Sequence, residues 1–207
     1  MSRSRIIAVV PIAIFTALLW IGGESVSVDW VRYASLATSA ATVLVAAYEK
    51  WLWAIIPVGR SRRPVLRGTW SGRLVTHWPD PETGQAPGPR DCYLVIRQTA
   101  STIRATLLTD ESRSSSAVAE LADNDGGTSL CYIFRNQPQI QVDHRSTAHH
   151  GAVVLEIDSG GTRLEGHYWT DRYSRGELEF GKRVRKYAAT FAEATDLQSL
   201  GPGAHDD

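Results

Sequence analysis

The sequence has almost no cysteine and no surplus of charge of either sign. Only 2 cysteines, Cys92 and Cys131, occur in 207 residues, which is too few for a disulfide scaffold or a four-cysteine zinc site. Basic and acidic residues are balanced at 22 each, and residues 64–207 carry 15 basic against 19 acidic side chains. Because non-specific binding to DNA or RNA needs surplus positive charge, a domain that coats a nucleic-acid polymer is excluded.

Sequence motifs of familiar catalytic and metal sites are also missing. The chain contains no G-x-S-x-G, H-E-x-x-H or phosphate-binding Walker motif, and nothing in the sequence places a base near Ser114–Ser116. His149 and His150 are adjacent, but neighbouring strand residues point to opposite faces, so this pair does not suit one metal ion. We therefore expect no catalytic residues, no cofactor and no metal.

Long uncharged stretches are present, but only near the N-terminus. Residues 6–23 (IIAVVPIAIFTALLWIGG) contain no charge, and as a helix they span roughly 27 Å, close to the ~30 Å hydrocarbon core of a bilayer. Residues 33–48 form a second uncharged stretch of sixteen. Within residues 1–63 we therefore predict a hairpin of two transmembrane helices, at about 6–23 and 31–48.

The end of the second span has two readings. Residues 49–58 fit an interfacial segment, because their tryptophans suit the headgroup level of a membrane. A span that continued to Ile56 would carry Glu49 and Lys50 into the membrane, which is costly. We favour the interfacial segment.

The charges around the two segments predict their topology. A cleaved signal peptide is the alternative for the first segment, but no A-x-A site follows and a second apolar segment comes soon after. Basic residues lie before the first span and after the second: Arg3, Arg5, Lys50, Arg60, Arg62 and Arg63. The positive-inside rule then places both termini in the cytoplasm.

The second segment is rich in small residues between 34 and 42. Small side chains let another helix approach closely. That helix is either the first span of the same chain or a span of another copy, and the sequence leaves both open.

Residues 64–187 read as an all-β domain. Short β-type runs are separated by segments rich in Gly, Pro, Asn, Asp and Ser. The runs are Gly68–His77, Cys92–Gln98, Thr102–Thr109, Ser116–Ala122, Ser129–Asn136, Ala148–Asp158, Arg163–Thr170 and Arg175–Phe180. About eight strands at near-regular spacing predict a small antiparallel up-and-down β-barrel, whose closure removes edge strands; a β-sandwich is the alternative.

The segment after the last strand run has two features. The basic run KRVRK at 182–186 would either contact anionic lipid or form a solvated strand end. Residues 188–207 are mildly helical and end in a segment that we expect to be a flexible tail.

Alternation along two of the runs places polar groups at one end of an otherwise apolar face. The two faces are Leu130, Tyr132, Phe134 and Asn136, and Leu164, Gly166, Tyr168, Thr170 and Arg172. An eight-stranded barrel has room inside for side chains or one small ligand. The polar ends therefore indicate either the mouth of a ligand cavity or strands that simply meet solvent.

Arginine dominates the basic residues of this domain, with 13 Arg against 2 Lys in residues 64–207. The guanidinium group binds phosphate through a planar fork, and aromatic faces stack on bases. A few arginines and tyrosines would hold one anionic nucleotide, although most of the arginines are expected in surface ion pairs.

Five motifs together carry a family resemblance. They are GTWSG at 68–72, VIRQT at 95–99, LCYIFRNQP at 130–138, HHG at 149–151 and LEGHYWTDRYSRG at 164–176. In this order, after two N-terminal spans, they resemble the two-transmembrane, β-strand-rich effectors of CBASS, the bacterial cyclic-oligonucleotide anti-phage signalling system. The resemblance implies a minimal eight-stranded barrel that binds a cyclic dinucleotide made by a partner nucleotidyltransferase (CD-NTase). It also implies that the spans form a homo-oligomer and disrupt the inner membrane, which kills the infected cell.

The alternation of side chains along the strands, together with their chemistry, indicates which residues would contact the ligand in such a barrel. Arginine and hydroxyl groups suit the phosphodiesters, and aromatic and amide groups suit the bases. The candidates are Gln98, Tyr132, Asn136, Arg145, Tyr168, Thr170 and Arg172. Trp70 is assigned to the barrel floor, because G-T-W is similar to the first strand of lipocalins. Two rivals remain: a membrane-anchored, lipocalin-like carrier of an apolar ligand, and an enzyme, which would need an acid–base pair in the cavity.

Overall fold

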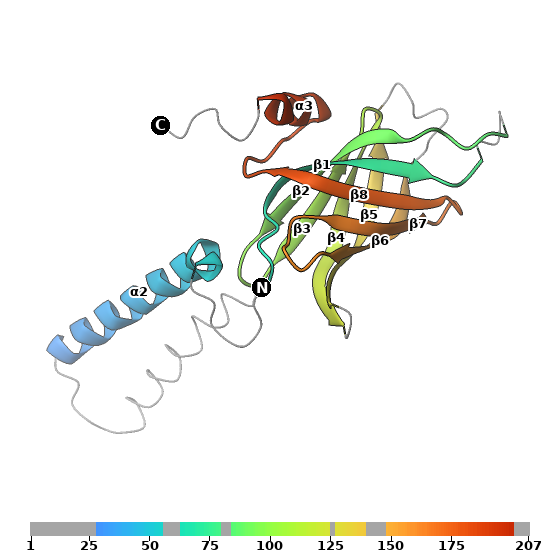
Figure 1. Cartoon of the computed structure of the whole chain (residues 1–207). Helices are drawn as coiled ribbons and strands as arrows, with labels where there is room; N and C mark the ends of the chain where they lie inside the picture. Colours follow the sequence, from blue (N-terminus) through green and yellow to red (C-terminus); the bar gives the residue numbers. More distant parts are fainter. Residues whose placement is uncertain (1–27, 56–62, 80–83, 125–126, 140–147, 201–207) are drawn as a thin grey trace. The chain divides into compact units, whose positions relative to one another are not determined.

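The computed structural model describes residues 28–55, 63–79, 84–124, 127–139 and 148–200, and Figure 1 traces the chain. The chain divides into two compact units, Met1–Val58 and Gly59–Asp207.

The N-terminal unit contains one long helix. Helix α2 spans Val28–Lys50 and is followed by a short 3-10 helix, η1, at Leu52–Ala54. The helix covers the predicted second span and leaves apolar side chains exposed, among them Leu36 (67% exposed) and Val43 (66%). The predicted first span, at 6–23, lies outside the described residues. Within the described part of the chain, none of the helices combines the length and apolar character needed to cross a bilayer.

The second unit is a closed antiparallel barrel of eight strands, which confirms the predicted barrel and excludes the sandwich (Figure 1). Each strand pairs with the next along the chain, and β1 closes the ring by pairing with β8. The strands are β1 (Gly68–Thr76), β2 (Arg90–Gln98), β3 (Ile103–Leu108), β4 (Ser112–Asn124), β5 (Gly127–Pro138), β6 (His149–Ile157), β7 (Leu164–Thr170) and β8 (Arg175–Val184).

Buried and exposed side chains alternate along the strands, and the buried ones form the inner face of the barrel. Along β5, Leu130, Tyr132 and Phe134 are buried, whereas Ile133 between them is 54% exposed. Since side chains alternate between the two faces of a strand, one parity of every strand fills the barrel. Gly166 lets the sheet curve tightly there, because a Cβ at this position would collide with the carbonyl of Val154 on the neighbouring strand.

Strand β4 is longer than the sequence indicates, since it begins at Ser112 rather than Ser116. A run of serines is typical of a turn, and here the structure overrides that preference. The pairing of β4 with β5 continues from Ser112 to Asn124 through a register shift between Ser116 and Val118. A bulge of this kind lets one strand change its alignment without losing its partner.

A C-terminal helix packs on the outer wall of the barrel. Helix α3 (Phe191–Ser199) begins at Thr190, whose hydroxyl accepts a hydrogen bond from Glu193 N at 3.2 Å. The Phe191 ring lies 5.2 Å from the ring of Tyr93 on β2, and Ala194 is fully buried. Residues 188–199 are thus part of the folded barrel unit, and the predicted domain boundary at 187 cuts through its packing.

Among the described residues, those that form the hydrophobic core of the barrel belong to the barrel unit. The residues of its two buried clusters all lie between Leu66 and Leu197, and none comes from residues 28–55. Because the ring of strands is closed and the residues of both clusters lie within 59–207, we expect a fragment covering these residues to fold by itself.

Candidate functional site

One end of the barrel is open and encloses a cavity of about 290 Å³. Its walls come from the last residues of β1, β3, β5 and β7 and from the first residues of the other four strands. These ends meet because consecutive strands run in opposite directions around the ring. The cavity therefore draws on all eight strands.

The other end of the barrel is closed by Trp70. This side chain is fully buried, and its Nε1 donates a hydrogen bond to the carbonyl of Leu66 at 2.7 Å. The guanidinium of Arg183 lies 5.0 Å from the centre of the Trp70 ring. Trp70 does not line the cavity and takes the floor position expected for it.

The deep wall of the cavity is apolar except for one hydroxyl. Leu107, Val153 and Leu178 line it together with Tyr132, which is 3% exposed. Among the described residues, no group hydrogen-bonds to the buried Tyr132 Oη. Burial raises the pKa of Tyr132, and the nearby Cys92 thiol raises it further, so the hydroxyl stays neutral. A buried unpaired hydroxyl is costly, and a ligand or water that reached it would remove that cost.

Hydrogen-bonded pairs form a polar layer above this wall. Ser114 Oγ donates to Asn136 Oδ1 at 2.7 Å, and both side chains are buried. The hydroxyls of Thr76 and Tyr168 share a hydrogen bond of 2.7 Å. A third pair, Thr170 with Ser174, is also 2.7 Å apart. This layer fixes the orientation of polar groups that a ligand would meet.

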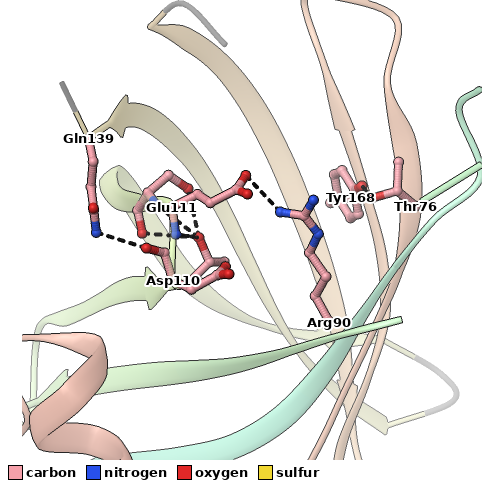
Figure 2. Close-up of polar contacts among 8 residues, drawn as sticks. Thr76, Arg90, Asp110, Glu111, Gln139 and Tyr168 are labelled. Carbon is pink, nitrogen blue, oxygen red and sulfur yellow. Dashed lines mark hydrogen bonds and ion pairs between the residues drawn. The ribbon is translucent and has the colours of Figure 1, made fainter. Parts of the chain in front are cut away.

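An ion pair crosses the rim of the cavity. Arg90 Nη1, at the start of β2, lies 2.7 Å from Glu111 Oε2 in the β3–β4 turn (Figure 2). Gln139 holds that turn in place: its backbone N donates to the carbonyl of Glu111, and its Nε2 donates to that of Asp110, both at 2.9 Å. Glu111 therefore occupies the guanidinium of Arg90 in this structure.

The β7–β8 turn forms another part of the rim. Arg172 lines the cavity, and its backbone N donates to Thr170 Oγ1 at 3.3 Å. The next residue, Tyr173, has a φ of 65° and is 80% exposed. Left-handed backbone in a bulky residue is strained, and such strain gathers at functional sites. Trp78 adds a second exposed aromatic side chain, at the β1 side of the rim.

The barrel sequence matches a known family. Residues 61–182, more than half of the chain, match the sequence model described as "Cap15, cyclic dinucleotide receptor domain". The chain belongs to the Cap15 family. It is also similar to CD-NTase-associated protein 15 of Staphylococcus schleiferi, with 23% identity over 157 residues that cover 75% of this chain and 81% of that protein. These matches confirm the resemblance to CBASS effectors inferred from the motifs.

Five of the seven residues nominated from the sequence line the cavity of this Cap15 domain. They are Tyr132, Asn136, Tyr168, Thr170 and Arg172. Arg145 lies outside the described residues. Of the five cavity residues, two lie on β5, two on β7 and one in the turn after β7, on the two faces that the alternation indicated.

The structure does not place Gln98, the remaining nominated residue, in this cavity. Its side chain does point inward, but it lies at the closed end, where its Nε2 donates to the carbonyl of Pro64 at 2.9 Å and its Oε1 accepts from Leu66 N at 2.7 Å. Strand β2 runs from the open end to the closed end, so its last residue is far from the cavity. Gln98 anchors the chain that enters the barrel, and we leave it out of the proposed ligand contacts.

The Cap15 cavity also has lining residues that sequence reasoning did not nominate. Those with polar or aromatic groups include Thr76, Trp78, Arg90, Glu111, Ser114 and His149. The alternation of side chains along β1 could have identified Thr76, which lies on the same face of this strand as Trp70. Arg90 follows a Pro-rich segment, and Glu111 lies in a turn, so neither carried a strand signal.

His149 and His150 lie on opposite faces of β6. His149 lines the cavity and packs edge-on against Phe134, with ring centres 6.4 Å apart. His150 lies on the outer side, with its Nδ1 3.5 Å from Asp171 Oδ2. In the part of the chain that the structure describes, no group of three or more His, Cys, Asp or Glu side chains is arranged to hold a metal ion.

Proposed function

We propose that the cavity of this Cap15 domain binds a cyclic dinucleotide, and that binding switches the N-terminal unit to membrane disruption. The layering of the cavity carries the proposal: an apolar depth, a hydrogen-bonding layer, and arginines at the rim. A nucleobase fits the first two layers and a phosphodiester fits the third. The family match supports the ligand class.

Cavity size indicates how such a ligand would sit. At about 290 Å³ the cavity is at the small end of ligand pockets, which hold roughly 300–1,000 Å³. We expect one base to enter between Tyr132 and Tyr168 while the sugar–phosphate ring stays at the mouth. Asn136 would then read the base edge, and Arg172 and Arg90 would contact phosphate.

In the Arg90–Glu111 ion pair, the Glu111 carboxylate would compete with a ligand phosphate for Arg90. A ligand phosphate that binds Arg90 must displace the Glu111 carboxylate, which lies 2.7 Å away and repels it. The β3–β4 turn that carries Glu111 would shift or relax when the ion pair opens. Binding would thus be weaker than the arginines alone allow, and more selective for ligands with a phosphate at this position.

We propose that residues 1–58 carry out the membrane disruption. The uncharged stretches at 6–23 and 33–48 and the exposed apolar side chains of α2 support insertion into the inner membrane, with both termini cytoplasmic. Ligand binding would favour a homo-oligomer by differential affinity for the two states. We propose no enzymatic step: the barrel is a sensor, and the partner nucleotidyltransferase supplies its ligand.

A truncation separates sensing from execution. A chain that starts at Gly59 should still bind the cyclic dinucleotide but should not kill cells when the nucleotidyltransferase is induced, whereas the full chain should. Growth and membrane integrity are the readouts. If the truncated domain still kills, the membrane mechanism is wrong and an enzymatic one is favoured. Binding of an apolar ligand without any nucleotide would favour the lipocalin-like carrier, which the apolar depth of the cavity allows.

A further inference from the structure

Arginines gather on the outside of the barrel at its closed end. Arg104 on β3 lies directly opposite Arg97 on β2. Arg67 precedes Gly68, which pairs with Ile96 next to Arg97, and the Cα of Arg185 is 3.3 Å from where a Gly68 Cβ would be. The cations thus follow one another from β3 across β2 to the start of β1 and the end of β8. We call Arg67, Arg97, Arg104 and Arg185 the basic band.

The described residues do not neutralise the band. None of its four arginines forms an ion pair with a described residue, and Arg97 instead stacks on Tyr187 at 4.5 Å. Like charges directly opposite on neighbouring strands are destabilising. This clustering of positive charge is a local feature of the surface, because residues 64–207 as a whole are net acidic. The positive charge of the band also acts on Arg183. Burial lowers the pKa of this arginine, and the charges of Arg185 and Arg67 lower it further.

The band lies at the end at which the chain enters the barrel. Residues 63–67 lead from the N-terminal unit into β1 and are fixed there by Arg63, which donates to the carbonyl of Ala100, and by Gln98. The cavity opens at the opposite end. A partner that covered the band would therefore leave the ligand cavity accessible.

We propose that the basic band docks on the anionic phospholipid headgroups of the membrane surface. The inference rests on the membrane part of the proposed function, since the chain would place this end of the barrel next to the lipid. Lipid phosphates fit guanidinium groups, and a membrane presents many of them on one surface. A nucleic-acid polymer fits less well, because the net acidic remainder of the domain would repel an extended polyanion.

Vesicle binding tests the inference on the fragment 59–207. The fragment should sediment with vesicles of mixed phosphatidylglycerol and phosphatidylcholine but not with pure phosphatidylcholine, and added salt should weaken binding. Arg97→Gln with Arg104→Gln should reduce partitioning at least tenfold, since it removes half of the band. Arg135→Gln with Arg175→Gln is the matched control, because both arginines are exposed and lie outside the band. Circular dichroism checks that both variants are folded.

Titration with cyclic dinucleotides separates this inference from the proposed function. The band variant should bind nucleotide as the wild type does. A fragment that binds nucleotide but not anionic vesicles, or that loses vesicle binding equally in the control variant, overturns the docking proposal alone. Equal binding to both vesicle types, or a preference for RNA over vesicles, also overturns it. A fragment that binds anionic vesicles but no nucleotide contradicts the proposed function instead.

Discussion

Replacing Glu111 with glutamine should tighten ligand binding. The side chains of Arg90 and Glu111 are only 39% and 29% exposed, and their atoms lie 2.7 Å apart at the rim. Once displaced from Arg90, the Glu111 carboxylate would still lie about 5 Å from a phosphate bound there, where the repulsion is roughly 0.8–1.7 kcal/mol for an effective dielectric constant of about 80 to 40. Glu111→Gln keeps the shape and removes the charge. We expect affinity to rise about fivefold, which corresponds to about 1 kcal/mol.

Isothermal titration with a double-mutant cycle measures this effect. Arg90→Gln alone should weaken binding about tenfold through loss of a charge-assisted hydrogen bond. In that background Glu111→Gln should gain less than about twofold, because no guanidinium remains to be released. Glu120→Gln, an exposed carboxylate elsewhere on β4, controls for the change in net charge. Weaker binding by Glu111→Gln would refute the competition, because it would mean that the carboxylate accepts hydrogen bonds from the ligand.

Three further predictions concern stability and execution. Thr190→Ala should lower the free energy of unfolding by about 1 kcal/mol in urea, because it removes the N-cap of α3; an unchanged midpoint would show that α3 is held by packing alone. Burial raises the pKa of the Cys92 thiol to about 12 and also raises that of Tyr132, so both favour the folded state while neutral. The contribution of these two groups to stability should therefore be constant below about pH 8.5 and be lost as they ionise in the unfolded chain above it, and Cys92→Ala with Tyr132→Phe should reduce that alkaline loss in pH-dependent denaturation. Bulky changes in the second apolar segment, Ala37→Leu with Ala41→Leu, should leave nucleotide affinity intact and reduce killing in a growth assay; loss of affinity would show that assembly helps to build the cavity.

The barrel could be predicted because its signals are local. Alternation and turn residues are properties of a few neighbouring positions, and eight such runs at regular spacing leave few ways to bury their apolar faces. The same alternation placed Tyr168 and Thr170 inside the barrel. Strand β4 shows the limit, because only its pairing with β5 makes the polar residues from Ser112 to Ser115 part of a strand.

The cavity could be predicted only in part because it depends on closure. Gln98 points inward as its parity requires, but parity does not tell which end of the barrel a residue occupies. Arg90 and Glu111 are 21 positions apart and meet only because β2 and β3 are antiparallel neighbours in the ring. Neither residue has a signal of its own in the sequence, since one follows a Pro-rich loop and the other lies in a turn.

The most direct test of the receptor function is equilibrium titration of the fragment 59–207 with cyclic dinucleotides of different base composition. We predict saturable binding of one or more of them, weakened at least tenfold, or by about 1.4 kcal/mol, in folded Arg172→Ala and Tyr132→Ala variants. Arg135→Ala, which removes an exposed arginine outside the cavity, should bind as the wild type does. Saturable binding with unchanged affinity in both cavity variants, or no binding of any cyclic dinucleotide to the folded fragment, would contradict this prediction.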